Sequence, residues 1–338
     1  MSTALYADEI STSHLNCRNR LMVFSGRSNP KLAQKIAAEI GVELSPVITK
    51  TFSNGEVYCR YEESIRGADV FIIQPTCGNE ELGLTINDAL SELLIMIDAA
   101  VGASARRVIA VTPWFGYARQ DKKSLPREPI SARLFARLLE SAGANRVLAM
   151  DLHAGQLQGM FQIPMDHLTA LMLLSEYFID QNLGGNLIVV APDAGSVKLN
   201  KKFASMLGAD LAILNKERPR QQVAEISHVI GDVEGKTALI IDDMIDTAGT
   251  LKAAGAALVA AGTSRVFAAA THGVFSGPAY ENLSSSAFEK IIVTDTIPLR
   301  PGAPGNVEVL SCAKLIASSI LRIFTNDSVS EVFGGANW

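Results

Sequence analysis

Cysteine is scarce in this chain of 338 residues: there are four, far apart and without a C-x-x-C pair. That spacing argues against a zinc knuckle and a disulfide framework, and it suits a reducing compartment. Positive charge is not in excess either, because 30 lysines and arginines stand against 35 aspartates and glutamates, a formal net charge of −5. The overall charge therefore gives no reason to expect nucleic acid or an anionic membrane as a partner.

Long hydrophobic runs are also missing. A helix that crosses a bilayer needs about 20 apolar residues, and the candidate stretch 87–101 is interrupted by Asp88, Glu92 and Asp98. Acidic Asp8 and Glu9 stand where a signal peptide has a basic and then an apolar stretch. We therefore expect a cytoplasmic protein with no membrane partner.

Short apolar runs alternate with amphipathic stretches from Leu21 onward. Buried strands are expected at Val23-Phe24, Val70–Ile73, Arg107–Val111, Val147–Met150, Leu187–Val190, Ala238–Ile241, Val266–Ala270 and Ile291–Val293. Helices are expected over Pro30–Ile40, Ala89–Ala100, Ser131–Ser141, Thr169–Gln181, Lys198–Leu207 and Thr250–Ala260. This alternation predicts an α/β fold with mainly parallel sheet, and the length is comfortable for two domains.

The chain also repeats itself. Leu139–His153 and Leu258–His272 are identical at seven of fifteen positions at a constant offset. The alternative is that any two helix–Gly–strand units look alike, since glycine suits the end of a helix. We favour a duplicated domain in which each copy places a histidine just past a strand, where open α/β sheets bind ligands.

The segment Ala238–Thr250 carries the most specific chemical pattern. An apolar strand ends in adjacent carboxylates, Asp242 and Asp243, which can accept hydrogen bonds from two neighbouring sugar hydroxyls. Backbone N–H groups at the start of a helix, beside Thr hydroxyls and a glycine, can bind a phosphate. The residues in that position are Asp246, Thr247, Ala248, Gly249 and Thr250. A capped helix after a surface loop is the alternative, but three carboxylates within five residues need a cationic or polyhydroxyl partner.

This segment resembles the phosphoribosyl-diphosphate binding loop of type I phosphoribosyltransferases and ribose-phosphate diphosphokinases. Four more segments resemble the class I diphosphokinases and occur in their order: Phe52–Glu56, Tyr117–Lys123, Asp151–Phe161 and Lys216–Pro219. The resemblance implies transfer of the diphosphoryl group of ATP to the 1-hydroxyl of ribose 5-phosphate, which gives 5-phosphoribosyl 1-diphosphate and AMP. It also implies that Asp242 and Asp243 hold the ribose hydroxyls, and that residues 246–250 wrap the 5-phosphate.

The same resemblance implies two tandem type I phosphoribosyltransferase-like domains, each a mainly parallel sheet flanked by helices. We expect a flexible arm over residues 1–19 and a first domain over 20–165 with nucleotide and oligomer contacts. The second domain, over 166–338, is expected to hold the ribose 5-phosphate site, with a C-terminal tail that packs back on the first domain.

Phe52, Asn54 and Glu56 offer an aromatic face, an amide and a carboxylate within five residues, a set that can recognise an adenine ring. A turn with Phe52 packed inward is the alternative. The resemblance places these residues in the ATP site of a neighbouring subunit, with Arg119 and Gln120 from the home subunit. A guanidinium suits both a phosphate and a purine face, although Arg119 alone fits a surface ion pair equally well.

Metal and phosphoryl contacts also follow from the resemblance. His153 and Asp193 are implied to contact Mg²⁺, with Mn²⁺ as the alternative ion. Magnesium prefers oxygen ligands, however, and a lone histidine is more often a packed or capping residue than a metal ligand. Lys216 and Arg218 lie in a charged stretch that we expect to be a mobile loop. They are implied to close over ATP and neutralise the migrating phosphoryl group; a solvated charged face is the alternative.

Two segments depart from the family pattern. Ser196 and Leu199 break the usual sequence after Asp193, and Lys198 is our candidate for the missing positive charge. The stretch Thr76–Asn87 is several residues longer than usual and borders the region that in this family binds regulatory phosphate and ADP. Residues at the matching regulatory positions are Ser64, Arg66, Lys123, Ser328 and Ser330. For Ser328 and Ser330 the alternative to a regulatory role is that the apolar residues of the tail pack and the serines face water.

A nucleotide site shared between subunits implies a homo-oligomer, and the family form is a hexamer. Two other functions remain open. A non-catalytic regulatory homologue would be expected to lose the Lys216–Arg218 stretch, which this chain keeps. A phosphoribosyltransferase would leave the first half of the chain, with Phe52–Glu56 and Arg119, unexplained.

Overall fold

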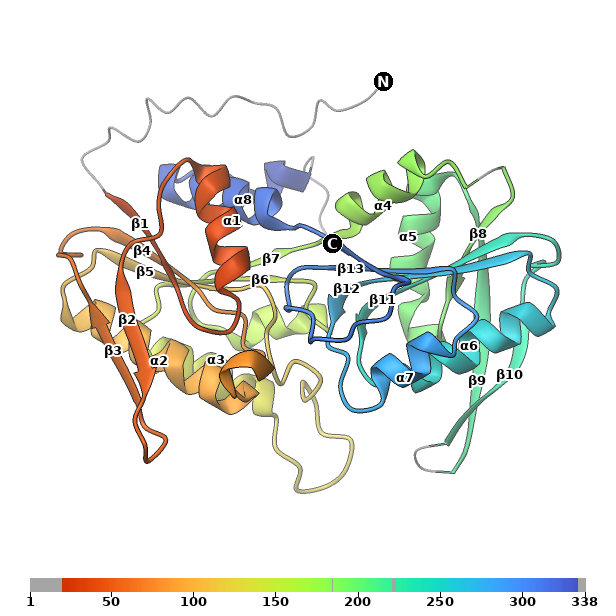
Figure 1. The fold of residues 1–338 in the computed structure, drawn as a ribbon, viewed down its shortest axis with the longest axis horizontal. Coiled ribbons are helices and arrows are strands. Elements are labelled where there is room, and N and C mark those ends of the chain that lie inside the picture. Colours follow the sequence, from red (N-terminus) through yellow and green to blue (C-terminus); the bar gives the residue numbers. More distant parts are fainter. Residues whose placement is uncertain (1–19, 184, 221–222, 334–338) are drawn as a thin grey trace. The chain divides into compact units, whose positions relative to one another are not determined.

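The computed structural model describes residues 20–183, 185–220 and 223–333, with the backbone alone at 216–220, 223–227 and 333. The predicted arm at 1–19 lies outside the described residues. The chain divides into two compact units (Figure 1). Of the described residues, the first unit holds 20–169, 296–298 and 311–333, and the second holds 170–295 and 299–310.

The first unit is built on a five-stranded parallel sheet in the order β1-β4-β5-β6-β7. Its strands are β1 (Leu21–Ser25), β4 (Asp69–Ile73), β5 (Arg107–Thr112), β6 (Arg146–Met150) and β7 (Met165–Leu168). A separate antiparallel hairpin comprises β2 (Val47–Thr51) and β3 (Val57–Tyr61). All five sheet strands point the same way, so their carboxyl ends meet at one edge, where such sheets bind ligands.

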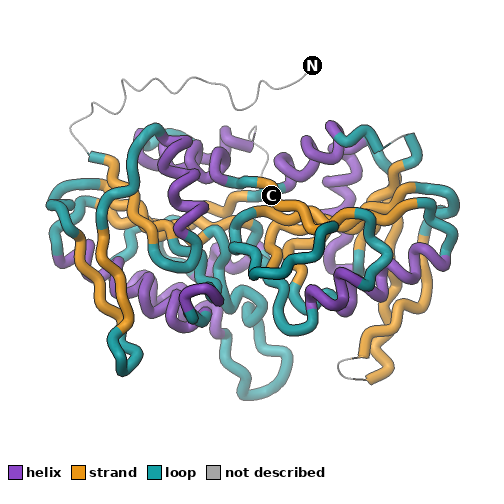
Figure 2. Tube along the Cα trace, in the orientation of Figure 1, coloured by secondary structure: helices purple, strands orange, loops and turns teal. Residues whose placement is uncertain are grey.

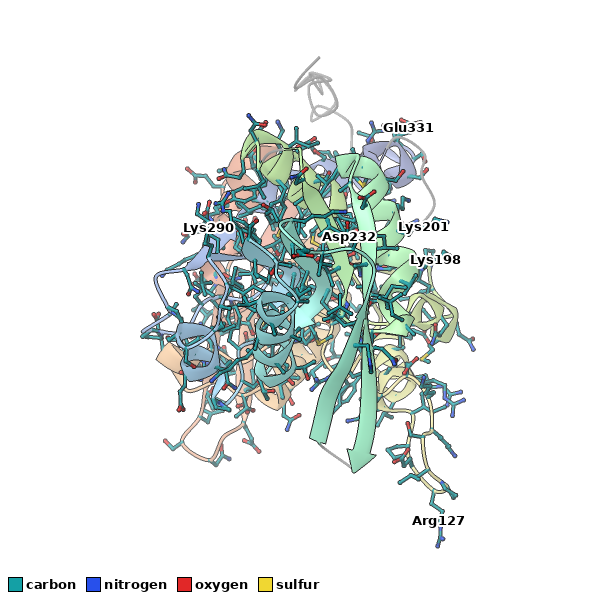
Figure 3. The ribbon with its side chains drawn as sticks, turned by 90° about the vertical axis from the view of Figure 1, so that its right-hand side faces the viewer. Arg127, Lys198, Lys201, Asp232, Lys290 and Glu331 are labelled. Atoms are coloured by element: carbon teal, nitrogen blue, oxygen red, sulfur yellow. The ribbon has the colours of Figure 1, made fainter. Side chains whose placement is uncertain are left out.

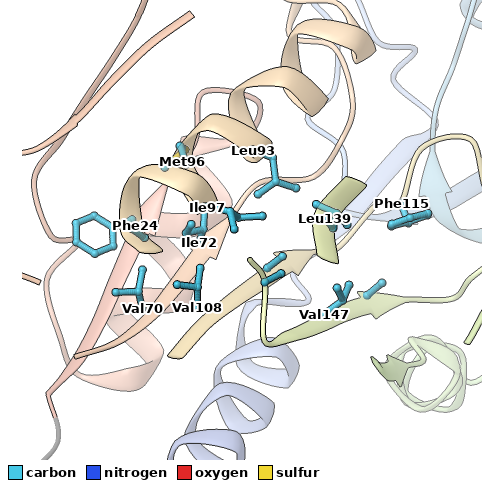
Figure 4. Packing of buried hydrophobic residues seen from close by; sticks show 14 of the residues in the cluster. Phe24, Val70, Ile72, Leu93, Met96, Ile97, Val108, Phe115, Leu139 and Val147 are labelled. Atoms are coloured by element: carbon cyan, nitrogen blue, oxygen red, sulfur yellow. The ribbon is translucent and has the colours of Figure 1, made fainter. Parts of the chain in front are cut away.

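Helices cover both faces of this sheet (Figure 2). They are α1 (Pro30–Ile40), α2 (Ile86–Gly102), α3 (Ser131–Ala142) and α8 (Ala313–Thr325). Alternate strand residues point to opposite faces, and one set, including Val70, Ile72 and Val108, packs against Leu93 and Met96 of α2 (Figure 4). The buried apolar faces account for the near-continuous hydrophobic runs of these strands.

The second unit contains a seven-stranded sheet in the order β10-β9-β8-β11-β12-β13-β14. Its strands are β8 (Leu187–Ala191), β9 (Asp210–Arg220), β10 (Val223–Ile230), β11 (Thr237–Ile245), β12 (Arg265–Gly273), β13 (Lys290–Thr294) and β14 (Val307–Leu310). All neighbours are parallel except β9 and β10. The helices of this unit are α4 (Leu171–Asp180), α5 (Val197–Leu207), α6 (Gly249–Ala260) and α7 (Ala279–Ser284).

The predicted α/β class with mainly parallel sheet is confirmed, and each predicted strand and helix is present within a few residues. The prediction omitted β2, β3, β7, β9, β10, β14, α7 and α8. Most of these are short, lie at sheet edges or carry charges, so their local pattern is weak. Within the described residues, no helix is long and apolar enough to cross a membrane.

Arg107 joins the start of β5 to the end of α8 within the first unit. One of its nitrogens lies 2.6 Å from Oδ2 of Asp69, a carboxylate that is fully buried, and another donates to Oδ1 of Asn326 at 2.8 Å. Arg107 also donates to the backbone carbonyls of Ile323 and Phe324, which lie in the last turn of α8. A cation at the carboxyl end of a helix satisfies carbonyls that have no helical partner.

We expect Arg107→Ala to lower the free energy of unfolding by about 2 kcal/mol, because the carbonyls of Ile323 and Phe324 lose their donor and Asp69 keeps only its bonds to Arg106. Arg265→Ala is the matched control: Arg265 pairs with Glu289, and both side chains are largely exposed. Exposed pairs contribute less than about 1 kcal/mol. Urea unfolding of both variants measures the difference, and equal losses would contradict the role assigned to Arg107.

Candidate functional site

The carboxyl ends of β8 and β11 bring three aspartates together in the second unit. These strands are parallel neighbours, so the residues that follow them lie at one edge of the sheet. Asp193 comes just after β8, and Asp242 and Asp243 lie near the end of β11. Asp242 and Asp243 are half-buried, and the backbone N–H of Asp243 donates to Oδ1 of Asp242 at 2.9 Å. The edge therefore presents acceptor oxygens without an excess of positive charge.

This crowding disfavours ionisation of Asp242. Burial raises the pKa of Asp242 well above its usual value, and the neighbouring Asp243 and Asp193 raise it further. A positive ion or a pair of hydroxyl donors would stabilise the ionised form. The geometry is thus suited to a ligand that carries hydroxyl groups, a cation, or both.

We expect Asp242→Asn to raise the free energy of unfolding of the ligand-free protein by on the order of 1 kcal/mol at pH 8. The pKa of Asp242 is higher in the folded than in the unfolded chain, so its ionisation costs stability as the pH rises. Below the ordinary pKa the carboxyl is protonated in both states, and the gain should disappear toward pH 4. Thermal unfolding at several pH values checks this, with the exposed Asp232 changed to Asn as control; a pH-independent gain would contradict it.

The loop after β11 turns sharply into the start of α6. Ala248 has φ +59° and stands immediately before α6, in the left-handed region that non-glycine residues rarely adopt. Thr247, Gly249 and Thr250 are exposed at the start of the helix. The side chain of Asn282 in α7 donates to the carbonyl of Thr247 at 2.9 Å and so supports the loop from outside. Helix starts of this kind attract anions.

Asp193 also organises the turn that leads into α5. Its Oδ1 accepts the backbone N–H of Ser196 at 3.0 Å and caps a short 3₁₀ helix, η4 (Ala194–Ser196). A Cβ added at Gly195 would lie 3.2 Å from that Oδ1, so the turn is tight there. Leu199, which departs from the family pattern, is half-buried.

Lysines extend along α5 from this turn. Figure 3 shows Lys198 and Lys201 on the helix, and both are exposed. Burial lowers the pKa of Lys202, and the charge of Lys198 lowers it further, which places these two lysines near each other. Positive charge is therefore present on the helix that follows Asp193, although the position of Leu199 itself carries none.

The predicted adenine contacts lie at the tip of the β2–β3 hairpin in the first unit. The backbone N–H of Phe52 donates to the carbonyl of Glu56 at 2.7 Å, and Oδ1 of Asn54 accepts the N–H of Glu56 at 3.2 Å. Gly55 has φ +93° and makes the turn. The turn considered as the alternative is present, but Phe52 is 45% exposed and not packed inward. Lys50 lies 5.4 Å from the centre of the Phe52 ring.

Arg119 and Gln120 are exposed in the connection between β5 and α3. Tyr117, at φ +63°, turns the chain, and its ring stacks on Phe135 of α3 with centroids 4.3 Å apart. Oε1 of Gln120 accepts the hydroxyl of Ser131 at 2.5 Å, at the start of α3. The connection that carries Arg119 and Gln120 is thus held by local contacts.

A hydrogen bond joins this connection to the loop of His153. Nε2 of Gln156 donates to Oδ2 of Asp121 at 2.6 Å, and Gln156 lies in the 3₁₀ helix η3 (Gly155–Met160) that follows His153. His153 is exposed, just past the end of β6. The carboxyl edge of the first sheet therefore brings Arg119, Gln120 and His153 to one side.

His167 in β7 was not predicted from the sequence as a site residue. It is largely buried, and its Nε2 accepts the backbone N–H of Leu152 at 2.9 Å, so Nε2 carries no proton. Burial lowers the pKa of His167, although the charge of Asp151 opposes this effect. The adjoining Asp151 has φ +35°. His167 thus holds the strained backbone beside His153, a contact between sequence positions too far apart for a local pattern to reveal.

The repeated histidines do not occupy equivalent positions. His153 lies beyond its strand, whereas His272 is fully buried inside β12 and is aligned with Met244 and Thr294 of the neighbouring strands. The prediction that each copy places a histidine past a strand end is wrong for His272, because β12 continues to Gly273.

The charged stretch with Lys216 and Arg218 is an extended strand, not the predicted loop. Its backbone lies in β9 and pairs with β10, with Lys216 opposite Ile226. The backbone hydrogen bonds come from the antiparallel partner β10. The charged sequence of residues 216–220 gives no indication of this pairing. The side chains of Lys216 and Arg218 lie outside the described part of the structure.

The five predicted regulatory residues all belong to the first unit. Ser64, Arg66 and Lys123 are exposed, and the carbonyl of Ser64 accepts a hydrogen bond from Arg20. The hydroxyls of Ser328 and Ser330 lie 2.8 Å apart. Val332 of the same tail is buried, so the tail both packs apolar surface and exposes its serines.

The segment Thr76–Asn87 folds around Asn79. The Asn79 side chain donates to the carbonyls of Arg27 and Ser28 at 3.1 and 3.2 Å, and it caps a 3₁₀ helix, η2 (Glu80–Leu82). Thr85 and Asp88 then form a reciprocal cap at the start of α2. This longer segment is a folded element tied to the β1–α1 connection.

Within the described residues, no group of three or more His, Cys, Asp or Glu side chains is placed to hold a metal ion. His153 belongs to the first unit and Asp193 to the second, so neither unit alone assembles that predicted pair. Mg²⁺ commonly binds through only one or two carboxylates and takes its other ligands from water and substrate phosphates, so a complete protein cage is not required.

Comparisons with known proteins agree along the chain. Residues 21–143 match a family model described as the N-terminal domain of ribose phosphate pyrophosphokinase, and residues 216–334 match a phosphoribosyl synthetase-associated domain. A ribose-phosphate pyrophosphokinase of Caldanaerobacter subterraneus is 50% identical over 93% of this chain and 98% of its own length. One from a Nostoc strain is 48% identical over 98% of this chain and 99% of its own.

A solved structure agrees as well. The phosphoribosylpyrophosphate synthetase of Mycobacterium smegmatis superposes with a TM-score of 0.84 at 42% identity, covering 91% of this chain and all of that one. The agreement in fold extends over both units, because the match covers most of the residues of each.

Proposed function

The chain belongs to the ribose-phosphate pyrophosphokinase family, and from that premise we propose that it transfers the diphosphoryl group of ATP to the 1-hydroxyl of ribose 5-phosphate. The products are 5-phosphoribosyl 1-diphosphate and AMP. The observation that carries the proposal is the juxtaposition, in one loop, of two half-buried carboxylates and an exposed helix start. A sugar phosphate has complementary groups, namely neighbouring hydroxyls and a dianion.

In this mechanism the second unit holds the acceptor. Asp242 and Asp243 accept hydrogen bonds from two ribose hydroxyls, and residues 246–250 bind the 5-phosphate at the start of α6. The sugar is thereby fixed with its anomeric oxygen free to attack the β-phosphorus of ATP in line with the leaving AMP. Fixing the reactants supplies a large part of the rate enhancement in phosphoryl transfer.

Cations stabilise the charge that develops during the transfer. Lys216 and Arg218 are proposed to contact the migrating phosphoryl group, since electrostatic stabilisation is the main chemical contribution a protein makes to this reaction. Asp193 and His153 are proposed to hold Mg²⁺, or Mn²⁺ in its place. When bound, the ion neutralises phosphate oxygens and orients the reactants.

ATP binding is proposed to involve Arg119 and Gln120 from one subunit and Phe52, Asn54 and Glu56 from a neighbour. The exposed ring of Phe52 supports this, because an aromatic side chain at a hairpin tip is available for stacking on a purine. An ATP site shared between subunits requires a homo-oligomer, and the proposed form is the hexamer of the family. Inorganic phosphate and ADP are proposed as effectors that bind near Ser64, Arg66, Lys123, Ser328 and Ser330. The cytoplasm is the proposed location.

Incubation with ATP, Mg²⁺ and ribose 5-phosphate should release AMP and consume the sugar phosphate in equal amounts. Repeating the assay with and without inorganic phosphate tests the proposed activation. A protein that forms no AMP under varied phosphate and metal would be a regulatory homologue. Diphosphate release that needs a nucleobase and no ATP would instead identify a phosphoribosyltransferase.

A further inference from the structure

Asn200 is a fully buried amide in α5, on a helix face that otherwise contributes Phe203 and Ala204 to the core. Its Nδ2 donates to the carbonyl of Ser196 at 3.0 Å and to the carbonyl of Ile241 at 3.2 Å. The first bond lies within one turn of the chain, and the second crosses to another element. One carboxamide thus uses both of its donor hydrogens to connect α5 with β11.

The two carbonyls belong to the two segments that carry the aspartates, the turn after β8 and the end part of β11. Ser196 closes the Asp193 turn, since its N–H donates to Oδ1 of Asp193 and its hydroxyl donates to the carbonyl of Asp193, each at 3.0 Å. Ile241 immediately precedes Asp242 in β11. Asn200 therefore bridges the Asp193 turn to the strand end with Asp242 and Asp243.

The amide at this place carries a cost beside its two hydrogen bonds. Among the described residues, Oδ1 of Asn200 has no hydrogen-bond partner although it is buried, and a buried acceptor without a partner costs about 1–3 kcal/mol. The bonds to Ser196 and Ile241 offset this cost, and they fix the position of the two segments that carry the aspartates. The bridge also holds like charges close together, because Asp193 and Asp242 repel each other.

We propose that Asn200 is a positioning residue, which sets the placement of Asp193 relative to Asp242 and Asp243 so that ribose 5-phosphate and Mg²⁺ can bind between the two loops. The assignment of these ligands rests on the proposed function. The bridge itself does not, because it is made of contacts within the ligand-free chain.

Two variants separate the bridge from the local bond. Asn200→Leu removes both hydrogen bonds and keeps the branching of the side chain, although leucine is larger than asparagine. Asn200→Ser keeps a donor for the carbonyl four residues earlier, as serines in helices do, but is too short to reach Ile241. Ser175→Ala is the matched control, because Ser175 is also buried in a helix of the second unit and donates to the carbonyl of Met172.

Both Asn200 variants should raise the KM for ribose 5-phosphate and the Mg²⁺ concentration for half-maximal rate about tenfold, the effect of one lost hydrogen bond of about 1.4 kcal/mol. Turnover at saturation should fall less than KM rises. Unchanged values in Asn200→Ser would overturn the proposal, and the serine variant decides the matter if the leucine variant fails to fold.

Hydrogen exchange tests the bridge independently of catalysis. Without ligands, backbone amides over residues 238–250 should exchange faster in both Asn200 variants than in wild type, and Ser175→Ala should not change them. Equal exchange in all four proteins would overturn the bridge. If wild type forms no AMP while the exchange differs as expected, the proposed function fails and the bridge stands.

Discussion

Replacing Lys216 with alanine is expected to lower kcat about 10³-fold while the KM for ATP changes only a few-fold. In the proposed reaction the ammonium group contacts the phosphoryl group as its charge shifts. An interaction that strengthens in the transition state lowers kcat when it is removed, whereas uniform binding would appear in KM. The backbone of Lys216 lies in β9, a strand paired along the β9–β10 hairpin, so we expect the alanine variant to fold.

The measurement is AMP formation at varied ATP and saturating ribose 5-phosphate. Lys216→Arg keeps the positive charge and should recover part of the rate. Lys201→Ala, which removes an exposed lysine from α5, controls for the loss of one charge and should retain wild-type kinetics. A similar loss in kcat and in the affinity for ATP would contradict the role assigned to Lys216.

Asp243→Ala is expected to raise the KM for ribose 5-phosphate about 100-fold, with a smaller loss in kcat and no change in the KM for ATP. Hydrogen bonds to a charged group contribute about 1.5–3 kcal/mol each, and Asp243 is half-buried at the end of β11, where a bound hydroxyl would be partly shielded from water. Initial rates at varied ribose 5-phosphate provide the test.

Asp243→Asn keeps one acceptor oxygen and should lie between alanine and wild type. Asp232→Asn serves as the control, since Asp232 is exposed and its carboxylate lies 3.7 Å from Lys236 on the same surface. A wild-type KM for ribose 5-phosphate in Asp243→Ala would show that the sugar binds elsewhere. The affinity measured by calorimetry, without ATP, distinguishes binding from catalysis.

Features that are contiguous in the sequence could be predicted from it. The helix Pro30–Ile40 was predicted with its observed bounds, because proline suits the first helical position and Gly41, at φ +82°, ends the helix. The loop from Asp242 to Thr250 carries its chemistry in consecutive residues, so its strand, turn and helix start could be identified together. The α8 helix also had a helical pattern, with Leu315, Ile316 and Ile320 on one face, but the prediction did not include it.

Features that depend on a distant partner could not be predicted. The charges of residues 216–220 indicated a loop, and only pairing with β10 makes them a strand. Pro219 is tolerated there because β8 pairs with β9 only as far as Ile213, so this part of β9 is paired with a strand on one side only. The sequence placed Asn200 in a predicted helix. Its hydrogen bond to the carbonyl of Ile241, in another element, could not be read from that pattern. His167 of β7 likewise accepts a hydrogen bond from Leu152, which follows the neighbouring strand β6. The spacing of apolar and polar residues within a segment gives no information about such contacts.

The first unit is interrupted in the chain by the second, and α8 returns to it only after residue 310. During synthesis, the sheet of the first unit therefore emerges long before α8, the helix that packs against α1. The second unit, which is nearly continuous, can collapse first on the ribosome. Nascent chains of this protein should thus be most prone to aggregation, and most dependent on chaperones, until the last helix has been released.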